Sequence, residues 1–379
     1  MSTKLSDLIK DLNSEHSGTL FSTGEITYNI ERIPFSSPRA NYMTYGGIPL
    51  GRVVEFAGEE SGGKTTTALD IVGNAQKYFQ AEWEEETNKL NNSKNLSKAQ
   101  IARLDYLNER GPRNIVWIDS ENTFDDLWAE KNGVNVETLI KMTPQQEYAE
   151  EIFQMTLQLM DTGDVGLVVL DSLGILMSKQ QYEKDVEDKT YGGIAMALTR
   201  FSKEACMICG KQKCTFIGIN QLRDDMNSMY GGVTTPGGRG WKHHCSLRIM
   251  FRKGELFDEK YKGLPRKSES CYGNIVEMQI VKTKVCKPNR LKGNYTLVYD
   301  KGVDAITDIV DLCINYDIIH KAGAWFTLIE PETGELILDS NGDTLKLQGA
   351  TAVKDYLESN TELLEKYKIE MDKICKQQD

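Results

Sequence analysis

The sequence predicts an α/β fold with a mostly parallel central sheet, a short N-terminal helical segment and a small C-terminal α/β domain. Four near-continuous apolar runs, separated by helical stretches, indicate buried parallel strands. They cover residues 52–58, 114–120, 165–172 and 214–220. Three further runs follow one another without long helical spacers, which favours an antiparallel extension of the sheet. These runs cover residues 246–251, 275–281 and 294–300.

The two ends of the chain differ in pattern from its middle. At residues 5–12 apolar side chains recur at helical spacing, which predicts a short amphipathic helix that docks on its own domain or on another subunit. Residues 24–45 contain two prolines and little periodicity, and are predicted to form a strand or turn region. From about residue 305 helices dominate, with one hairpin-like segment at 328–338.

A charged, helix-forming stretch at residues 78–111 interrupts the alternation of strands and helices. We predict a helical insertion on the surface there, and a partner-binding module is the second interpretation. The predicted domains are an N-terminal oligomerisation segment at 1–29, a core at 30–304 that carries the insertion, and a C-terminal domain at 305–379.

Composition excludes several classes of protein. The chain has 379 residues, of which 40% are hydrophobic and 27% charged, and these values exclude global disorder. Its apolar runs are too short to span a bilayer, and its N-terminus lacks the apolar stretch of a secretory signal. The net charge of -11 excludes coating of nucleic acid through bulk charge, so any DNA binding must be local.

Eight cysteines without regular spacing are typical of reduced thiols, so we predict a cytoplasmic protein. The spacing of Cys206, Cys209 and Cys214 is one that can bind zinc. No second paired motif follows, so thiols packed on one helix face are the favoured interpretation.

The strongest single signal is residues 58–65, which fit the phosphate-binding pattern G-x-x-x-x-G-K-[ST]. The pattern lies between an apolar strand and a helix, where backbone N–H groups can wrap a polyphosphate at the helix N-terminus. Lys64 would reach the β and γ phosphates, and the Thr65 hydroxyl would bind Mg²⁺. The predicted nucleotide-binding residues are Gly58, Glu59, Glu60, Ser61, Gly62, Gly63, Lys64, Thr65 and Thr66.

Two acids follow neighbouring predicted strands at their carboxyl ends. Asp171 ends the strand at 165–172, where it could hold Mg²⁺ together with Thr65. Glu121 follows the strand at 114–120 and is the candidate base that would polarise a water for attack on the γ-phosphate. Taken alone, Glu121 is more simply interpreted as a helix N-cap or a solvated loop acid.

Several segments recur, in the same order, in the bacterial RecA recombinases, which this sequence therefore resembles. They are GGIPLGRVVEFAGEESGGKTTTALDIVGNAQ, NIVWIDSENTFDDLWAEKNGV, LVVLDS, FIGINQLR, TTPGGRGWKHHCSLRI, VKTK and KAGAW. The resemblance covers roughly residues 30–355, apart from 78–111 and a longer loop at 253–272. It implies a RecA-like ATPase core that uses ATP and Mg²⁺.

The resemblance implies roles for the residues that match family motifs. Glu121 takes the position of the catalytic glutamate. Asp125 and Trp128 match an Asp and a Tyr that meet the adenine by hydrogen bond and by stacking. Gln221 matches the glutamine that senses the γ-phosphate and passes its state to the following DNA-binding loop.

Lys282 and Lys284 match a lysine pair that reaches the neighbouring subunit's γ-phosphate. From the sequence alone, they would be outward residues of an edge strand. The resemblance thus implies a homo-oligomer, a helical filament with ATP between protomers, in which the lysines act as an arginine finger does.

Two loops are implied to line the filament and hold DNA, at 183–191 and 223–242. The second is rich in glycine and small polar residues, which suits a segment ordered by its ligand. Tyr191 and Met226 stand where the family wedges side chains between base triplets. The predicted DNA-binding residues are Tyr191, Lys203, Arg223, Met226, Gly237, Gly238, Arg239 and Lys242.

The chain departs from the family pattern at four positions. Met196 replaces an arginine of the DNA-facing helix, and Asp225 replaces a basic or neutral loop residue. His243 stands where the family has a phenylalanine central to subunit contact, and Glu59 stands where proline is usual.

We therefore predict a recombinase that assembles on single-stranded DNA, pairs it with double-stranded DNA and exchanges strands in recombination and repair, with DNA-stimulated ATP hydrolysis. The first alternative is a RecA-fold ATPase of another class, a hexameric helicase or a clock-type hexamer, without strand exchange. The VKTK motif and the glycine-rich loop argue against it. The second alternative is a non-catalytic DNA-binding or mediator protein, against which the intact Lys64, Thr65, Glu121 and Asp171 argue.

Overall fold

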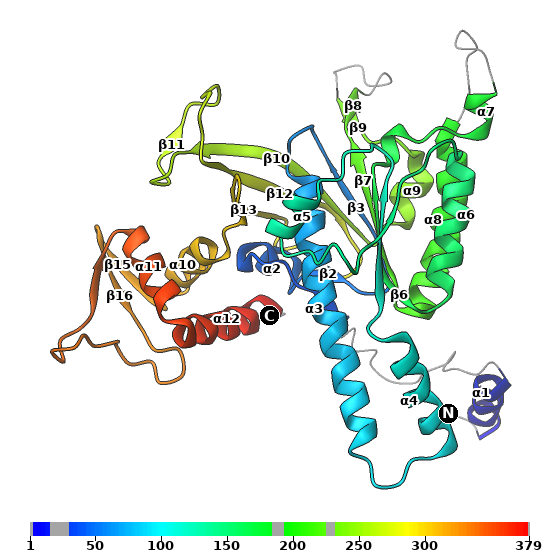
Figure 1. Cartoon of the computed structure of the whole chain (residues 1–379), viewed down its shortest axis with the longest axis horizontal. Helices are drawn as coiled ribbons and strands as arrows, with labels where there is room; N and C mark the ends of the chain where they lie inside the picture. Colours follow the sequence, from blue (N-terminus) through cyan, green and yellow to red (C-terminus); the bar gives the residue numbers. More distant parts are fainter. Residues whose placement is uncertain (1–2, 16–29, 184–192, 225–231, 378–379) are drawn as a thin grey trace. The chain divides into compact units, whose positions relative to one another are not determined.

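The computed structural model describes residues 3–15, 30–183, 193–224 and 232–377 (Figure 1). Contacts divide the chain into two units, residues 1–31 and 32–379. In the first unit, α1 (Thr3–Glu15) contains the predicted amphipathic stretch. The second unit combines a large, mostly parallel sheet with a small antiparallel sheet near the C-terminus, which confirms the predicted fold class. Across the described ranges, no helix is both long enough and apolar enough to cross a membrane.

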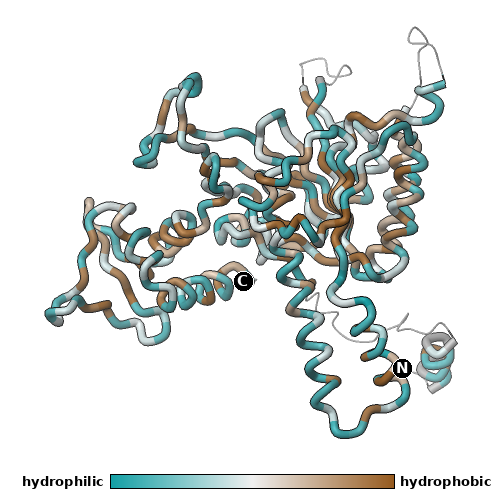
Figure 2. Tube along the Cα trace, in the orientation of Figure 1, coloured by the Kyte–Doolittle hydropathy of each residue, from teal (hydrophilic) through white to brown (hydrophobic). Residues whose placement is uncertain are grey.

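The four strands predicted to be parallel form the centre of the large sheet. Neighbouring strands run parallel from β3 (Val53–Gly58) through β7 (Thr215–Gln221), β6 (Val165–Asp171) and β4 (Asn114–Asp119) to β5 (Ile140–Met142). Every residue of β3 and β6 is buried, and Figure 2 shows apolar strands at the centre of the sheet. Because parallel strands point the same way, their carboxyl ends share one edge of the sheet.

The predicted antiparallel extension is also present. β10 (Leu247–Phe257) runs parallel to β3 on one side and antiparallel to β12 (Gly273–Thr283) on the other. β13 (Lys292–Val298) and β14 (Gly302–Val303) complete this half in antiparallel order. β10 therefore joins a buried parallel half to a half-exposed antiparallel half.

Helices pack on the parallel half and bury its apolar side chains. On one face lie α6 (Ala149–Asp161), α8 (Gly193–Gln212) and α9 (Gly238–His244). Phe153 and Phe201 stack between α6 and α8, with ring centroids 4.6 Å apart. Burial of such a side chain contributes about 1.5–3 kcal/mol, so this face is a main source of stability.

Three cysteines belong to the same apolar region. Cys209 and Cys214 are fully buried in it, and Cys206 packs against it. Burial raises the pKa of Cys214 to about 12 and raises the pKa of Cys209 as well, so both stay protonated thiols.

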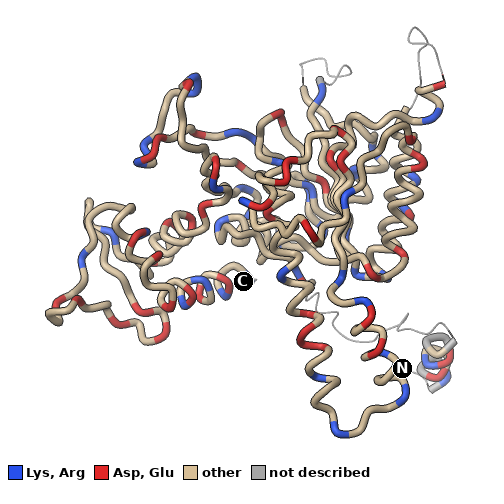
Figure 3. Tube along the Cα trace, viewed as in Figure 1, with Lys and Arg blue, Asp and Glu red and all other residues tan. Residues whose placement is uncertain are grey.

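The stretch 78–111 forms a helical hairpin made of the outer end of α3 (Lys64–Asn91) and α4 (Lys98–Arg110). The two helices are linked by the Trp83 indole, whose Nε1 donates to the carbonyl oxygen of Leu107 at 2.8 Å. Charged residues of both signs lie along this hairpin (Figure 3). The stretch is therefore helical, and its being an insertion in the core stays a prediction.

The C-terminal part has its own apolar cluster. A three-stranded antiparallel sheet packs with three helices, and Phe326, Leu357 and Tyr367 are buried between them. An isolated bridge between Ile329 and Leu336 closes the predicted hairpin-like segment. The elements are α10 (Ala305–Asn315), β15 (Ile319–Ala322), β16 (Trp325–Leu328), β17 (Lys346–Gln348), α11 (Ala350–Ser359) and α12 (Thr361–Lys376).

Part of the prediction for residues 24–45 was wrong. In the described part of this stretch, residues 30–45, only β1 (Arg32–Ile33) is a strand, and it pairs with β2 (Ile48–Pro49). α2 (Pro38–Thr44) is a helix instead. Ser37 is its N-cap and accepts a hydrogen bond from Ala40 N, and proline is well suited to the first helical position. The prolines and the lack of periodicity favoured a strand or turn, whereas Pro38 starts a helix.

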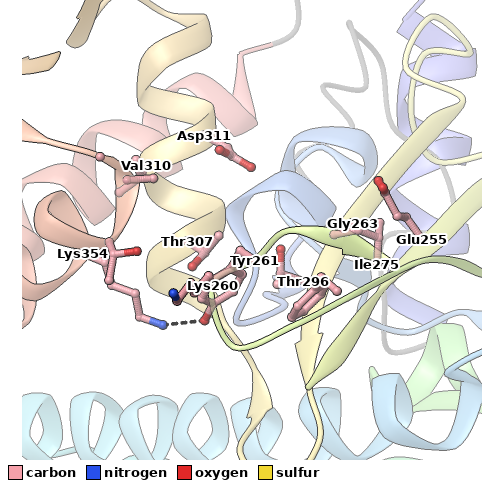
Figure 4. Close-up of a pocket in the computed structure, with 14 residues that line it drawn as sticks. Glu255, Lys260, Tyr261, Gly263, Ile275, Thr296, Thr307, Val310, Asp311 and Lys354 are labelled. Atoms are coloured by element: carbon pink, nitrogen blue, oxygen red, sulfur yellow. Dashed lines mark hydrogen bonds between the residues drawn. The ribbon is translucent and has the colours of Figure 1, made fainter. Parts of the chain in front are cut away.

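The long loop at 253–272 reaches the C-terminal part. It includes the end of β10 and β11 (Gly263–Leu264), and it lines a cleft of about 470 Å³ together with α10 and the start of α11 (Figure 4). Lys354 Nζ donates to the hydroxyl of Tyr261 at 2.9 Å and to Asp304 Oδ2 at 2.6 Å. The loop is thus bonded to α11.

Candidate active site

The phosphate-binding loop, residues 58–65, joins β3 to α3 at the carboxyl edge of the parallel strands. Ser61 and Gly63 have left-handed backbone conformations, with φ of 57° and 92°, which turn the loop into the helix. A Cβ atom on Gly63 would lie 3.0 Å from both Cγ atoms of Val276, so the position is crowded as well. α3 is 28 residues long and starts at Lys64, so its positive end and its free N–H groups face the loop. This geometry suits a phosphate group.

The Lys64 side chain is bonded to its own loop. Its Nζ donates to the carbonyl oxygens of Gly58 at 3.1 Å and of Glu59 at 2.6 Å. Burial lowers the pKa of Lys64, and the charges of Asp171 and Glu121 oppose that shift. A phosphate is a stronger partner for an ammonium than a neutral carbonyl, so a nucleotide can take over these bonds.

Thr65 and Asp171 form the second half of the nucleotide site. Thr65 Oγ1 donates to Asp171 Oδ2 at 2.7 Å. Burial, with a smaller contribution from the charge of Glu121, raises the pKa of Asp171 to about 6, although the hydrogen bond from Thr65 opposes the shift. A buried carboxylate is stabilised by a nearby cation, and oxygen atoms are the ligands that Mg²⁺ prefers. The residues present fit a magnesium ion held at Thr65 and Asp171.

Glu121 meets two partners from neighbouring strand ends. Ser172 Oγ donates to Glu121 Oε1 at 2.5 Å, and Gln221 Nε2 donates to the same oxygen at 2.9 Å. Ser172 follows β6 and Gln221 ends β7, so the ends of three parallel strands converge on this carboxylate. Both bonds end on Oε1, which leaves Oε2 as the oxygen placed to accept a proton.

The two predicted adenine-binding residues lie at the start of α5 (Asp126–Lys131). Asp125 is its N-cap and accepts a hydrogen bond from Trp128 N at 3.0 Å. The indole Nε1 of Trp128 donates to Thr66 Oγ1 at 3.2 Å. Trp128 thereby forms a wall of a cleft of about 340 Å³ beside the phosphate-binding loop, whereas the Asp125 carboxylate serves as a helix cap.

Sequence reasoning missed three polar residues that line the same cleft. They are Lys253 of β10, Asn274 of β12 and Tyr299, which follows β13. Tyr299 donates its hydroxyl proton to Asn274 Oδ1 at 2.9 Å, and Lys253 Nζ lies 5.7 Å from the Tyr299 ring centroid. These residues are far apart in the sequence and form no local motif. Only the pairing of the antiparallel strands brings them together. Lys253 adds a cation to a cleft suited to phosphate.

Lys282 and Lys284 bond elsewhere in their own chain. Lys282 Nζ donates to the carbonyl oxygens of Lys242 and His243, both at 2.6 Å, and Lys284 Nζ donates to that of His243 at 2.8 Å. These carbonyls lie at the C-terminal end of α9, where free oxygens attract cations. Burial lowers the pKa of Lys282, and the charge of Lys284 lowers it further. Within one chain the pair is therefore tied to α9.

Part of the predicted DNA-binding surface lies outside the described residues. This applies to Tyr191, Asp225 and Met226, and to nearly all of the loop at 183–191. The second loop is described at both ends, where β8 (Arg223–Asp224) pairs antiparallel with β9 (Val233–Thr234).

The described DNA-binding candidates are mostly on the surface around this stem. Arg223 Nη2 donates to the carbonyl oxygen of Gly174 at 2.9 Å, and Lys242 Nζ donates to Thr234 Oγ1 at 2.6 Å. Gly237 and Gly238 start α9 with left-handed φ angles of 101° and 69°. The remaining positions are exposed: Lys203 and Met196 on α8, and Arg239 on α9.

Comparison with known proteins points to one family. Residues 8–82 and 96–304 match the model of the RecA N-terminal domain. The chain is 32% identical to Protein RecA of Mesoplasma florum, over 86% of this chain and 81% of that protein. It is 30% identical to Protein RecA of Porphyromonas gingivalis over 84% and 78% of the two chains. It is 27% identical to Protein RecA of Fusobacterium nucleatum over 92% and 78%. The chain belongs to the RecA family.

Proposed function

We propose that this protein is an ATP-dependent recombinase that assembles as a helical filament on single-stranded DNA and exchanges strands with a duplex. The observation that carries the proposal is the bond between Gln221 and Glu121. Gln221 ends β7 and lies two residues before the start of the glycine-rich segment 223–242, so one side chain links the candidate base to the candidate DNA loop.

The site residues divide the work of hydrolysis. Lys64 and the N-terminal N–H groups of α3 bind the phosphates of ATP. Glu121 Oε2 accepts the proton of the attacking water, while the donors on Oε1, Ser172 and Gln221, fix the orientation of the carboxylate. Magnesium bound at Thr65 and Asp171 would neutralise phosphate charge. Trp128 would stack on the adenine ring of ATP.

In this proposal, Lys64 is not the only lysine that acts on the phosphates, because a lysine pair of a neighbouring subunit adds positive charge. Lys282 and Lys284 are bonded to α9 carbonyls within their own chain. An ATP molecule lying between protomers would meet this pair from the neighbour, and added positive charge stabilises the phosphoryl-transfer transition state. Hydrolysis then depends on assembly.

Local DNA binding reconciles the proposal with the net charge of -11. Arg223, Arg239 and Lys242 lie on or beside the stem of the second loop, and Lys203 lies on α8 near the C-terminal end of α9, whereas the acidic run at 82–86 lies on the hairpin of α3 and α4. A filament repeats the basic loop stem once per subunit. The DNA surface therefore belongs to the assembly.

The test measures ATP hydrolysis with and without single-stranded DNA, alongside joint-molecule formation between single-stranded and duplex DNA. We expect DNA to stimulate hydrolysis and joint molecules to form. The Lys64→Ala variant should lose both activities. Hydrolysis that is indifferent to DNA, without joint molecules, would contradict the proposal and favour a RecA-fold ATPase of another class.

A further inference from the structure

A buried carboxylate lies between the candidate ATP site and the stem of the candidate DNA loop. Glu55 is in the middle of β3, three residues before Gly58, and its exposure is 0%. An isolated carboxylate in such a position is strongly destabilising unless it is paired and hydrogen-bonded. The hydrogen-bond and salt-bridge partners of Glu55 therefore indicate which elements this carboxylate holds together.

Three donors from three other elements satisfy Glu55. Asn220 Nδ2 of β7 donates to Oε1 at 2.9 Å, and Trp241 Nε1 of α9 donates to the same oxygen at 2.7 Å. The Arg248 guanidinium of β10 forms a salt bridge with Oε2. β7 precedes the DNA loop at 223–242 and α9 begins within its last residues, so one carboxylate bonds both ends of that segment to the strand that leads into the phosphate-binding loop.

The same donors hold the returning end of the loop. Asn220 Nδ2 also donates to the carbonyl oxygen of Pro236 at 3.0 Å, and Arg248 Nη2 donates to Thr235 Oγ1 at 3.3 Å. Among the described residues, Asn220 Oδ1 is buried without a hydrogen-bond partner. The next residue, Gln221, bonds Glu121. A shift of α9 therefore reaches the candidate base through two consecutive residues of β7.

We propose that Glu55 is a positioning residue that couples the DNA loop to the ATP site, by fixing α9 and Asn220 in one arrangement. The inference rests on the proposed function, because it assigns a means of regulation to the same ATPase. Glu55 bonds Asn220, Trp241 and Arg248 and is not among the residues that line the cleft beside the phosphate-binding loop. Its effect must therefore appear in the response to DNA, while nucleotide affinity stays unchanged.

The discriminating variant is Glu55→Gln, which keeps the size of the side chain but replaces one acceptor oxygen by a donor. That donor must face the N–H groups of Trp241 and Asn220 or those of Arg248, so one set of bonds is lost. We expect nucleotide affinity and DNA-free hydrolysis within about threefold of wild type, and DNA stimulation reduced by about tenfold or more. Hydrogen exchange in residues 232–245, measured without DNA, should become faster.

The matched control is Asp308→Asn, which neutralises another carboxylate with 0% exposure, bonded to Thr296 and Arg39. It should keep full DNA stimulation, so equal losses in both variants would overturn the inference. Full stimulation in Glu55→Gln would also overturn it. If Glu55→Gln does not fold, Trp241→Phe removes one donor while keeping the ring, and it should show the same selective loss; retained stimulation would overturn the inference.

Failure of the proposed function gives a different result. In that case DNA does not stimulate hydrolysis by the wild-type protein. The hydrogen-exchange measurement, made without DNA, still tests whether Glu55 holds the loop stem. Unchanged exchange at 232–245 in both Glu55→Gln and Trp241→Phe would show that Glu55 does not hold the loop stem. Faster exchange confined to that segment would support the positioning role.

Discussion

The two halves of the central sheet present their functional candidates in different ways. In the parallel half, Glu121, Asp171 and Gln221 all lie at or just past strand ends, and the shared carboxyl edge brings them beside the phosphate-binding loop. In the antiparallel half, Lys282 and Lys284 lie on or just past a strand that pairs edge to edge, and they bond the end of α9. The parallel half thus brings its candidates together at one edge within the chain, whereas the lysine pair of the antiparallel half is bonded to α9, away from the phosphate-binding loop, and is proposed to act on a neighbouring subunit.

The largest expected effect tests the parallel half. Glu121→Gln keeps the hydrogen-bonding shape but removes the proton acceptor, so hydrolysis should fall by about 100-fold or more while ATP binding persists. Steady-state hydrolysis and equilibrium binding of a fluorescent nucleotide measure the two quantities. Glu130→Gln, an exposed acid on α5, is the control and should behave as wild type. Near-normal turnover in Glu121→Gln would assign the base elsewhere.

The next effect tests the antiparallel half. The double variant Lys282→Ala/Lys284→Ala should bind ATP normally, because neither lysine lies in the cleft beside the phosphate-binding loop of its own chain. DNA-stimulated hydrolysis should fall by about tenfold or more, because the transition state loses cations from the neighbour. Lys292→Ala, an exposed lysine on the adjacent β13, is the matched control. Wild-type stimulation in the double variant would remove the proposed role across the interface.

A smaller effect tests the wall of the nucleotide cleft. Trp128→Ala removes the aromatic face and the bond to Thr66, so nucleotide affinity should weaken by about tenfold. Trp128→Tyr keeps a flat face and should lose far less. Isothermal titration with ATP and Mg²⁺ compares the three proteins, and equal affinities would discard the stacking assignment.

The difference between the parallel and antiparallel halves also explains which site residues could be predicted from the sequence. Buried parallel strands are continuous apolar runs, and polar residues follow them directly, so the positions of Asp171 and Glu121 at strand ends could be predicted from local pattern, whereas Gln221 was predicted from the family resemblance alone. Lys253 and Tyr299 could not be predicted in this way, because only the register of distant antiparallel strands brings them to the cleft. The local pattern gave a wrong prediction around Pro38, where a strand or turn was expected and α2 begins.

The last prediction compares one buried acid from each half, and it concerns stability, with no effect expected on the nucleotide site. Asp70 of α3 packs near the parallel half and accepts from Ser36 N, whereas Asp308 accepts from Thr296 of β13. Burial raises the pKa of Asp70 to about 6 and that of Asp308 to about 7, from 3.8 for an exposed Asp. Arg39 opposes the shift of Asp308 only in part, because it also pairs with Asp311 at a shorter distance.

Both shifts make the folded protein hold protons that the unfolded chain has released, so the free energy of unfolding should decrease as pH rises from about 4 to about 7 and then level off. At about 1.4 kcal/mol per pKa unit, the two groups together should contribute a loss of about 5 kcal/mol over that interval, measured by urea denaturation at each pH. Asp308→Asn should flatten the upper part of the curve, between pH 6 and 7, more than Asp70→Asn does. The ranking is informative because Asp308 lies where β13 meets α10, and so reports on the antiparallel half. A curve that Asp70→Asn flattens equally between pH 6 and 7 would mean that burial costs the two halves of the sheet the same.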